Sequence, residues 1–255
     1  LMCGINAVET LLQQAPERVI RVWLKSGNSR LEQLKSLTTQ LGIAVEVSSD
    51  ASLSAQLPDV PHQGVIAEFK PRPAIGEDAL LDLVSNADNP VVLVLDGVQD
   101  PHNLGACLRS AAAAGVLAVV TTKDKAVGLT PAARKSSAGA SELIPLAVVT
   151  NLVRTLKALQ EVGLWVLGLD MDQPHSLFAP ETDQWLTGPT ALVMGGEGEG
   201  MRRLTEKTCD RLVSIPMPGG MESLNVSVAA SIVLFSMVRA RGGSGSTAGA
   251  LGDQN

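Results

Sequence analysis

Three short segments of the chain combine polar residues and glycines in patterns that could do chemistry. The first runs from Asp96 to Ser110 and reads DGVQDPHNLGACLRS. Within it, Asn103 could cap a helix by accepting a hydrogen bond from a backbone N–H group. Arg109 follows six residues later, so the two side chains share one side of a helix only loosely. Taken alone, this segment indicates a helix cap and a surface arginine.

The second segment, Leu192 to Met201, reads LVMGGEGEGM and is rich in glycine. Glycines without side chains let a ligand approach the backbone closely. A dinucleotide-binding fingerprint, G-x-G-x-x-G, would need glycine at position 201, where Met201 stands. Glu197 and Glu199 would also repel a pyrophosphate and suit a cationic or hydroxyl-rich ligand better. The pattern therefore disfavours a nicotinamide-dependent oxidoreductase.

The third segment, Ile215 to Ala229, reads IPMPGGMESLNVSVA. Ser223, Asn225 and Ser227 are polar residues at the beginning of an otherwise apolar helix. Helix capping explains one of them but not three. The free N–H groups of a helix start can also bind a ligand.

Alternating apolar strands and helices are expected to position these segments. The continuous apolar run from Val91 to Leu95 is typical of a parallel strand covered on both faces. The pattern predicts a doubly wound α/β domain, in which ligands bind where strands end. Each of the three segments follows such a strand. The other expected strands are 116–120, 164–169, 190–194 and 211–215, and the expected helices are 103–114, 152–160 and 224–239.

A smaller α/β unit precedes this domain. Ala7, Val8, Leu11 and Leu12 lie on one face of a short helix, and a second helix carries leucines at 31, 34, 37 and 41. Strands are expected at 19–24, 43–47 and 64–69. Prolines at 71 and 73 then hold the chain extended. We therefore predict a first domain over 1–70, a linker over 71–76, a second domain over 77–241 and a flexible Gly/Ser tail over 242–255.

The composition excludes several classes of protein. The 255 residues carry a formal net charge of −6, so a strongly basic nucleic-acid binder is excluded and any RNA contact must use a local basic patch. Aromatic residues make up 2%, which disfavours a single-strand binder built on stacking platforms. Three widely spaced cysteines indicate reduced thiols rather than a disulfide framework or a zinc site. Because no apolar run spans a membrane and no signal-peptide pattern opens the sequence, we expect a cytoplasmic protein without membrane contact.

In this order, the three segments resemble the three motifs of the SpoU/TrmH class of SPOUT RNA 2′-O-ribose methyltransferases. The most specific match is SLNVSVA, from Ser223 to Ala229. The stretches GINAV, from Gly4 to Val8, and HQGV, from His62 to Val65, resemble the substrate-binding domain of one branch. Members of that branch methylate a guanosine in the P loop of 23S rRNA. The resemblance spans the whole chain apart from the tail.

The resemblance implies a fold, partners and a co-substrate. The second domain should be a SPOUT domain with a parallel sheet and a deep trefoil knot, and the first an RNA-gripping domain similar to ribosomal protein L30e. The enzyme should be a homodimer whose active site is completed by the partner chain, acting on 23S rRNA or a large-subunit precursor. S-adenosylmethionine should be the methyl donor, with no metal. The residues implied to bind it are Met194, Gly195, Gly196, Ile215, Met217 and Leu224.

The resemblance also assigns catalytic positions. Arg109 matches an arginine often described as the general base, although an arginine side chain keeps its proton up to about pH 12. We expect Arg109 instead to orient the ribose phosphate and to stabilise the developing alkoxide. The other catalytic positions are Asn103, Glu197, Ser223 and Asn225. A methyltransferase for another rRNA or tRNA site, or a non-catalytic ribosome-assembly factor on the same scaffold, would share much of this pattern.

Basic side chains are candidates for RNA phosphate contacts, with a solvated surface as the alternative explanation for each. These are Lys123, Lys125, Arg134, Lys135, Arg202 and Arg203.

Overall fold

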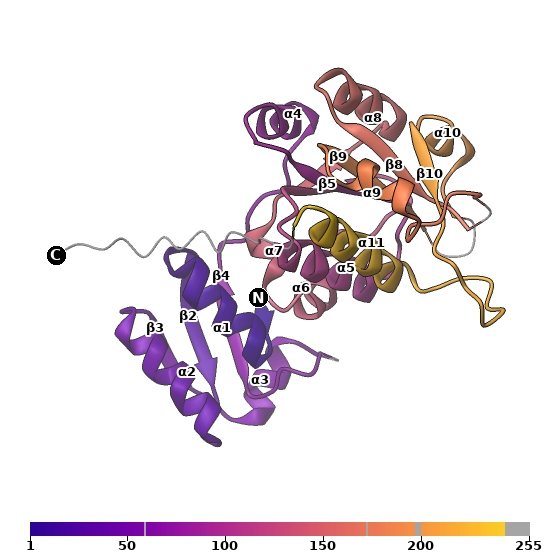
Figure 1. The fold of residues 1–255 in the computed structure, drawn as a ribbon. Helices are drawn as coiled ribbons and strands as arrows, with labels where there is room; N and C mark the ends of the chain where they lie inside the picture. Colours follow the sequence, from indigo (N-terminus) through magenta and orange to yellow (C-terminus); the bar gives the residue numbers. More distant parts are fainter. Residues whose placement is uncertain (59, 172, 197–199, 243–255) are drawn as a thin grey trace.

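Two β-sheets organise the protein, one built before residue 70 and one after residue 90 (Figure 1). The structure is a computed structural model that describes residues 1–58, 60–171, 173–196 and 200–242. Helices pack against both sheets, and the chain crosses once from the small sheet to the large one.

The small sheet has four strands in the order β1-β4-β2-β3. Strands β2 and β3 are parallel, whereas β4 runs antiparallel to both of its neighbours. The predicted helix face is confirmed, because Ala7, Val8, Leu11 and Leu12 are all buried in this unit's core. The elements are β1 (Met2–Cys3), α1 (Ile5–Gln14), the 3-10 helix η1 (Pro16–Arg18), β2 (Val19–Leu24), α2 (Ser29–Gln40), β3 (Ala44–Val47), α3 (Asp50–Gln56) and β4 (Val65–Phe69).

The large sheet has six strands, all parallel, in the order β10-β8-β9-β5-β6-β7. Every residue of the central strand β5 is buried, as its continuous apolar sequence predicted. The predicted α/β fold with a parallel sheet is therefore confirmed. The strands are β5 (Val91–Asp96), β6 (Ala118–Thr122), β7 (Leu146–Val149), β8 (Trp165–Leu169), β9 (Thr190–Gly195) and β10 (Arg211–Val213).

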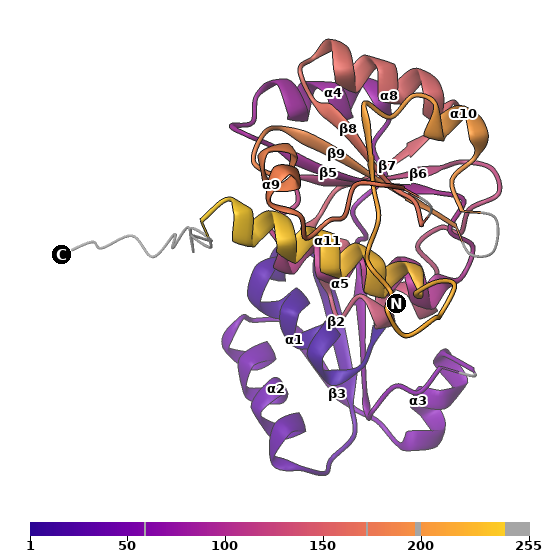
Figure 2. The ribbon, with the colours of Figure 1, turned by 45° about the vertical axis from the view of Figure 1, so that its right-hand side comes forward.

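Helices cover both faces of the large sheet (Figures 1 and 2). On the face nearer the small sheet lie α5 (Pro101–Ala113), α6 (Pro131–Ser136), α7 (Ala140–Leu143), α9 (Pro180–Leu186) and α11 (Val226–Ala240). On the opposite face lie α4 (Glu77–Ser85), α8 (Leu152–Glu161) and α10 (Arg203–Glu206). Two separate apolar cores result, one on each side of the sheet, as in a doubly wound domain.

Several boundaries differ from the sequence expectations. Asn103 does not cap the helix, because Asp100 accepts a hydrogen bond from the His102 backbone N–H at 2.7 Å and the helix begins at Pro101. The expected strand 116–120 lies at 118–122 instead. Val116, the first residue of the expected strand, instead donates its backbone N–H to Ala111 O at the end of the preceding helix. The expected strand 211–215 ends at Val213.

The segment predicted as a linker is held at its end. The backbone N–H of Ile75 donates to Leu146 O at 3.0 Å, and the backbone N–H of Val148 donates to Ile75 O at 3.0 Å. Ile75 thus forms a parallel bridge beside β7 and packs against the apolar core on the side of the large sheet that α4 and α8 cover. Residues 243–255, most of the predicted tail, lie outside the described residues.

Within the described ranges, no helix combines the length and the apolar character that a membrane crossing would need.

All three cysteines are free. Burial raises the pKa of the Cys107 thiol to about 12. Burial, with added repulsion from Asp210, raises the pKa of Cys209 to about 12 as well. Burial also raises the pKa of Cys3. Since the thiolate is the reactive form, all three cysteines should be poor nucleophiles in the folded protein.

We predict that the native protein resists maleimide labelling at mildly alkaline pH and reacts at all three cysteines once unfolded. A Ser36→Cys variant, which places a thiol at an exposed position of α2, should gain one fast-reacting site. Mass spectrometry of timed samples measures this directly. Rapid labelling of the wild type at Cys107 would contradict the buried placement.

Candidate active site

A cavity of about 590 Å³ opens at the carboxyl edge of the large sheet. Its walls come from the ends of β8 and β9, from the segment after β10, and from the start of α11. In open α/β sheets, ligands bind at this edge. The cavity is therefore the candidate site, and residues of the second and third sequence segments line it.

The structure brings together all six residues that the resemblance assigned to cofactor binding. They lie on the walls of this one cavity, although they come from two segments about 20 residues apart. Ser223 and Asn225 line the same cavity. Glu197 lies outside the described residues. The lining residues among the predictions are Met194, Gly195, Gly196, Ile215, Met217, Ser223, Leu224 and Asn225.

The two glycines at the end of β9 are required by close backbone approach. A Cβ atom on Gly195 would lie 2.2 Å from the carbonyl carbon of Gly200. A Cβ atom on Gly196 would lie 2.6 Å from the carbonyl oxygen of Gly97, in the segment after β5. The backbone N–H of Gly196 also donates to Asp96 O at 2.8 Å. Only residues without side chains allow this packing, which leaves bare backbone on the cavity wall.

Asn225 joins the first and third sequence segments. Its side-chain N–H donates to Asn103 Oδ1 at 2.9 Å. Its own Oδ1 accepts from the backbone N–H of Ser227 at 2.9 Å, and so caps α11. One amide therefore caps the last helix and ties it to the buried Asn103 on α5. The second function gives Asn225 a role beyond capping, as the sequence of this segment suggested.

Arg109 is exposed on α5 and is not among the residues lining the cavity. Within the described part of the chain its side chain makes no hydrogen bond or ion pair, so its guanidinium is available to a ligand. The next residue, Ser110, shares a hydrogen bond of 2.7 Å with Ser231 of α11. Helix α5 is thus tied to α11 at two points, beside Arg109 and at Asn103.

Asp96, at the end of β5, anchors the far side of the glycine segment. Its side chain is completely buried, and Oδ2 accepts from the backbone N–H of Arg202 at 2.9 Å. The Arg202 Nε atom lies 3.4 Å from Oδ1. The carboxylate therefore pins residue 202 to the strand that precedes Asn103 and Arg109.

In the small unit, the two stretches that resembled a substrate-binding domain meet in space. The side-chain oxygen of Gln63 accepts from the backbone N–H of Ile5 at 3.0 Å, where α1 begins. The backbone N–H of Gly4 donates to Val65 O at 3.4 Å. The His62 ring accepts from the backbone N–H of Gly64 at 3.0 Å. These contacts give the paired stretches a structural role at the amino end of α1.

One of the basic residues proposed to contact RNA is not available for that purpose. The Arg134 side chain is only 13% exposed and forms an ion pair with the buried Glu142. The prediction that it contacts RNA phosphates is wrong for that reason. Arg202 is partly engaged by Asp96, but its side chain is 46% exposed.

Sequence reasoning missed several residues of the cavity. Leu169, Asp170 and Met171 line it at the end of β8. The strand itself was predicted, and a carboxylate directly after an apolar strand is a signal that could have found Asp170. Glu206, on the short helix α10, also lines the cavity and carried no such signal. Among the described residues, no cluster of His, Cys, Asp and Glu is arranged to hold a metal ion.

Comparison with known proteins gives matches along nearly the whole chain. Residues 90–235 match the profile of the SpoU rRNA Methylase family, and residues 1–74 match that of the RNA 2′-O ribose methyltransferase substrate binding family. The 23S rRNA (guanosine-2′-O-)-methyltransferase RlmB of Photorhabdus laumondii is 47% identical over 94% of this chain and 98% of its own. RlmB of Escherichia coli K12 is 46% identical over the same shares.

Solved structures share the fold. The SpoU methyltransferase AviRb from Streptomyces viridochromogenes superimposes with a TM-score of 0.74 at 23% identity, over 94% of this chain and 88% of that one. A structure described as an RNA 2′-O ribose methyltransferase gives a TM-score of 0.72 at 25% identity, again over 94% and 88%.

We predict that Gly195→Ala abolishes binding of S-adenosylmethionine, the donor that the resemblance implies, as measured by calorimetry. The added methyl group must displace the backbone at residue 200, at a cost of about 1–3 kcal/mol in stability. Gly219→Ala is the matched control, because nothing lies within 4 Å of a Cβ atom there. The control should bind normally. Equal affinity of the two variants would show that the donor does not use this wall.

Proposed function

Since the chain belongs to the SpoU rRNA methylase family, we propose that it transfers a methyl group from S-adenosylmethionine to the ribose 2′-OH of a guanosine in 23S rRNA. The assignment of 23S rRNA as the substrate is supported by the high sequence identity, along both units, to bacterial enzymes named for this reaction. A match confined to the large unit would support the chemistry alone. We propose the P loop of 23S rRNA as the target and the cytoplasm as the place of action.

The cavity at the carboxyl edge fits the methyl donor. It offers bare backbone at Gly195 and Gly196 and apolar side chains at Ile215, Met217 and Leu224. Apolar walls with a few polar groups are typical of cofactor sites. S-adenosylmethionine supplies a methyl group on a sulfonium, an electrophile that is already activated. The protein then has to align the acceptor oxygen and dispose of its proton.

Arg109 is proposed to act on the acceptor ribose. Its exposed guanidinium can bind the neighbouring phosphate in a bidentate manner and stabilise charge that develops on the 2′ oxygen. An arginine holds its proton too tightly to be an efficient base. Asn103 and Asn225, joined by their hydrogen bond, hold α5 against the cavity. Ser223 lies on the cavity wall, where its hydroxyl can contact the ribose, and Glu197 is proposed to fix Arg109 or a subunit contact.

A trefoil knot in the large unit is proposed from the family resemblance. Strand β10 is an edge strand, yet the helix that follows it, α11, packs against α5, which follows the central strand β5. The segment 214–225 must therefore cross the carboxyl edge of the sheet, as the ribbon in Figure 2 allows the reader to follow. The glycine segment after β9 is pinned to β5 nearby. For the small unit, we propose the L30e-like fold.

A homodimer is also proposed, with α11 at its centre. Val228 and Phe235 lie two turns apart on one side of this helix and are 48% and 49% exposed. Leu224, at the cavity, is 38% exposed on the same segment. Exposed apolar side chains grouped on one side of a helix in this way are typical of a protein interface. A second chain at this surface would lie beside the cavity and could bring its Arg109 toward it.

The proposed reaction predicts a specific product. The wild type should transfer labelled methyl groups to 23S rRNA that lacks its own P-loop methyl, giving 2′-O-methylguanosine on nuclease digestion and mass spectrometry. Arg109→Ala should bind S-adenosylmethionine normally, because Arg109 does not line the cavity, yet lose about 100-fold or more in kcat. If the protein binds the donor but does not methylate this RNA, the P loop of 23S rRNA is not its target. A protein that binds no donor would be a scaffold instead.

The dimer makes its own prediction. Phe235→Asp should convert a dimer into a monomer in sedimentation analysis, because a charge on this apolar face cannot be solvated in an interface. Leu204→Asp is the matched control, since Leu204 is 68% exposed on α10, away from α11. The control should stay dimeric. A Phe235→Asp variant with unchanged mass would place the interface elsewhere.

A further inference from the structure

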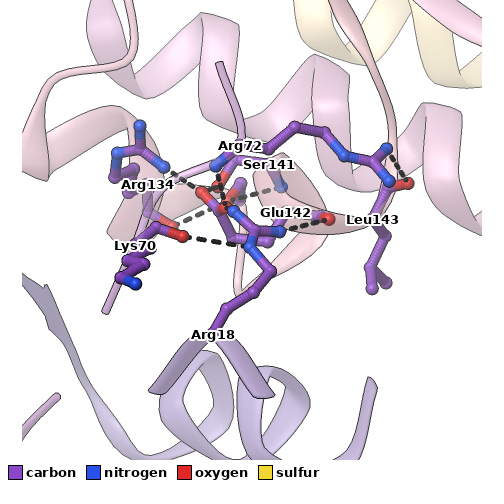
Figure 3. A network of polar contacts seen from close by, with 8 residues as sticks. Arg18, Lys70, Arg72, Arg134, Ser141, Glu142 and Leu143 are labelled. Carbon is purple, nitrogen blue, oxygen red and sulfur yellow. Dashed lines mark hydrogen bonds and ion pairs between the residues drawn. The ribbon is translucent and has the colours of Figure 1, made fainter. Parts of the chain in front are cut away.

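A buried carboxylate connects the two units of the protein. Glu142, on α7, has a side chain that is only 1% exposed. Its Oε2 pairs with Arg18 of the small unit, and its Oε1 pairs with Arg134 of α6 (Figure 3). The backbone N–H of Arg72 donates to Oε2 at 3.0 Å. One acidic group thus contacts the small unit, the crossing segment and the large unit.

Further contacts of Arg18 and Arg72 hold the same junction. Arg18 Nε donates to Lys70 O at 3.0 Å, and Arg18 Nη1 donates to Glu142 O at 3.4 Å. Arg72 Nη1 donates to Leu143 O at 3.2 Å. Packing adds to these bonds, because a Cβ atom on Gly139 would lie 2.6 Å from the Thr10 Cβ atom of α1. The crossing segment is therefore fastened on both sides rather than free to swing.

Helices α6 and α7 carry this junction to the helix that bears Arg109. A Cβ atom on Gly105 of α5 would lie 2.4 Å from Ala133 O of α6, so the two helices touch through their backbones. The His102 ring of α5 shares a hydrogen bond of 2.9 Å with Ser136 of α6. In Figure 1, α6 and α7 lie between the small unit and the large sheet. A shift of the small unit would therefore act on α5 through rigid contacts.

Stability alone does not explain this arrangement. Removing a carboxylate and two guanidinium groups from water is costly, and apolar residues of similar size often pack at least as well. The cost is visible at Arg134, whose pKa is lowered by burial and by the nearby Arg18 charge. What a buried ion network adds is direction, because charged hydrogen bonds to both carboxylate oxygens hold the three side chains in a defined arrangement.

We propose that Glu142 is a positioning residue for methyl transfer, which sets where RNA held by the small unit meets Arg109. This inference rests on the proposed function. RNA gripped by residues 1–70 must place one ribose beside α5, and small errors of alignment are costly to rate. The Arg18–Glu142–Arg134 network fixes that alignment before RNA binds. No role in donor binding follows from it, because none of the three residues lines the cavity.

Arg18→Met tests the network from the side of the small unit. It removes one charge while Glu142 keeps its pairing with Arg134. Arg154→Met is the control, because the ion pair of Arg154 with Glu77 joins two helices of the large unit and does not involve the small unit. Glu142→Gln, nearly identical in shape, tests the centre of the network. Melting temperature and calorimetric binding of S-adenosylmethionine report whether each variant folds.

Two readouts separate positioning from a general loss of structure. The first is single-turnover methylation of 23S rRNA. The second is the distance distribution between spin labels at Gln33→Cys in α2 and Glu161→Cys in α8, both exposed, in protein diluted with unlabelled chain. The native cysteines are buried or protonated and should not label.

For Arg18→Met and Glu142→Gln we expect a broadened distance distribution and a single-turnover rate constant lowered about 10- to 100-fold. Donor affinity and RNA affinity should be unchanged, and Arg154→Met should behave as the wild type. A broadened distribution with an unchanged single-turnover rate constant would overturn the proposal, as would a distribution that does not change. If the wild type itself methylates no RNA, the proposed function fails, whereas the distance measurement still decides whether Glu142 sets the placement of the units.

Discussion

The chain must return from an edge strand to the middle of the sheet, and the candidate site is built by that return. Strand β10 lies at one edge of the large sheet. Helix α11 nevertheless packs against α5, on the face of the central strands that is nearer the small sheet. The hydrogen bond from Asn225 to Asn103 fixes the end of this return, and the same amide begins the final helix. Between β10 and Asn225 the chain passes over the strand ends and closes the cavity. This bond adds a fixed polar contact to the apolar packing that holds α11 against the sheet.

Glycine makes the return possible. Gly195 and Gly196 lie where the chain after β9 touches both residue 200 and the segment after β5, at distances that no side chain tolerates. Asp96 then holds the same region from β5 by accepting from Arg202. The glycine-rich sequence thus serves packing and ligand access at once. Its two glutamates distinguish it from phosphate-binding loops, and a donor with a sulfonium charge suits them better.

The large sheet was predicted well because its strands follow from local apolar patterns, and the six residues that the resemblance proposed for donor binding all line one cavity. The buried run from Val91 to Leu95 identified the central strand, and the glycine and serine segments carried a specific family resemblance. Asn103 was misread as a cap because the helix begins three residues earlier. Asp100 is the N-cap, and Pro101 is the first helical residue. Glu142 could not be found at all. Its partner Arg18 is 124 residues away, and no periodicity connects two such positions before the chain is folded. Arg134 looked like an exposed RNA contact for the same reason.

The proposed function depends on one cavity at the carboxyl edge of the sheet receiving the methyl donor. A crystal structure of the wild type with S-adenosylmethionine tests this placement of the donor most directly. We expect the donor to lie against the backbone of Gly195 and Gly196 and beside Ile215 and Leu224, with the reactive methyl group accessible from the side of α5. A donor bound at another place, for example between the two units, with this cavity empty, would contradict the proposed donor site.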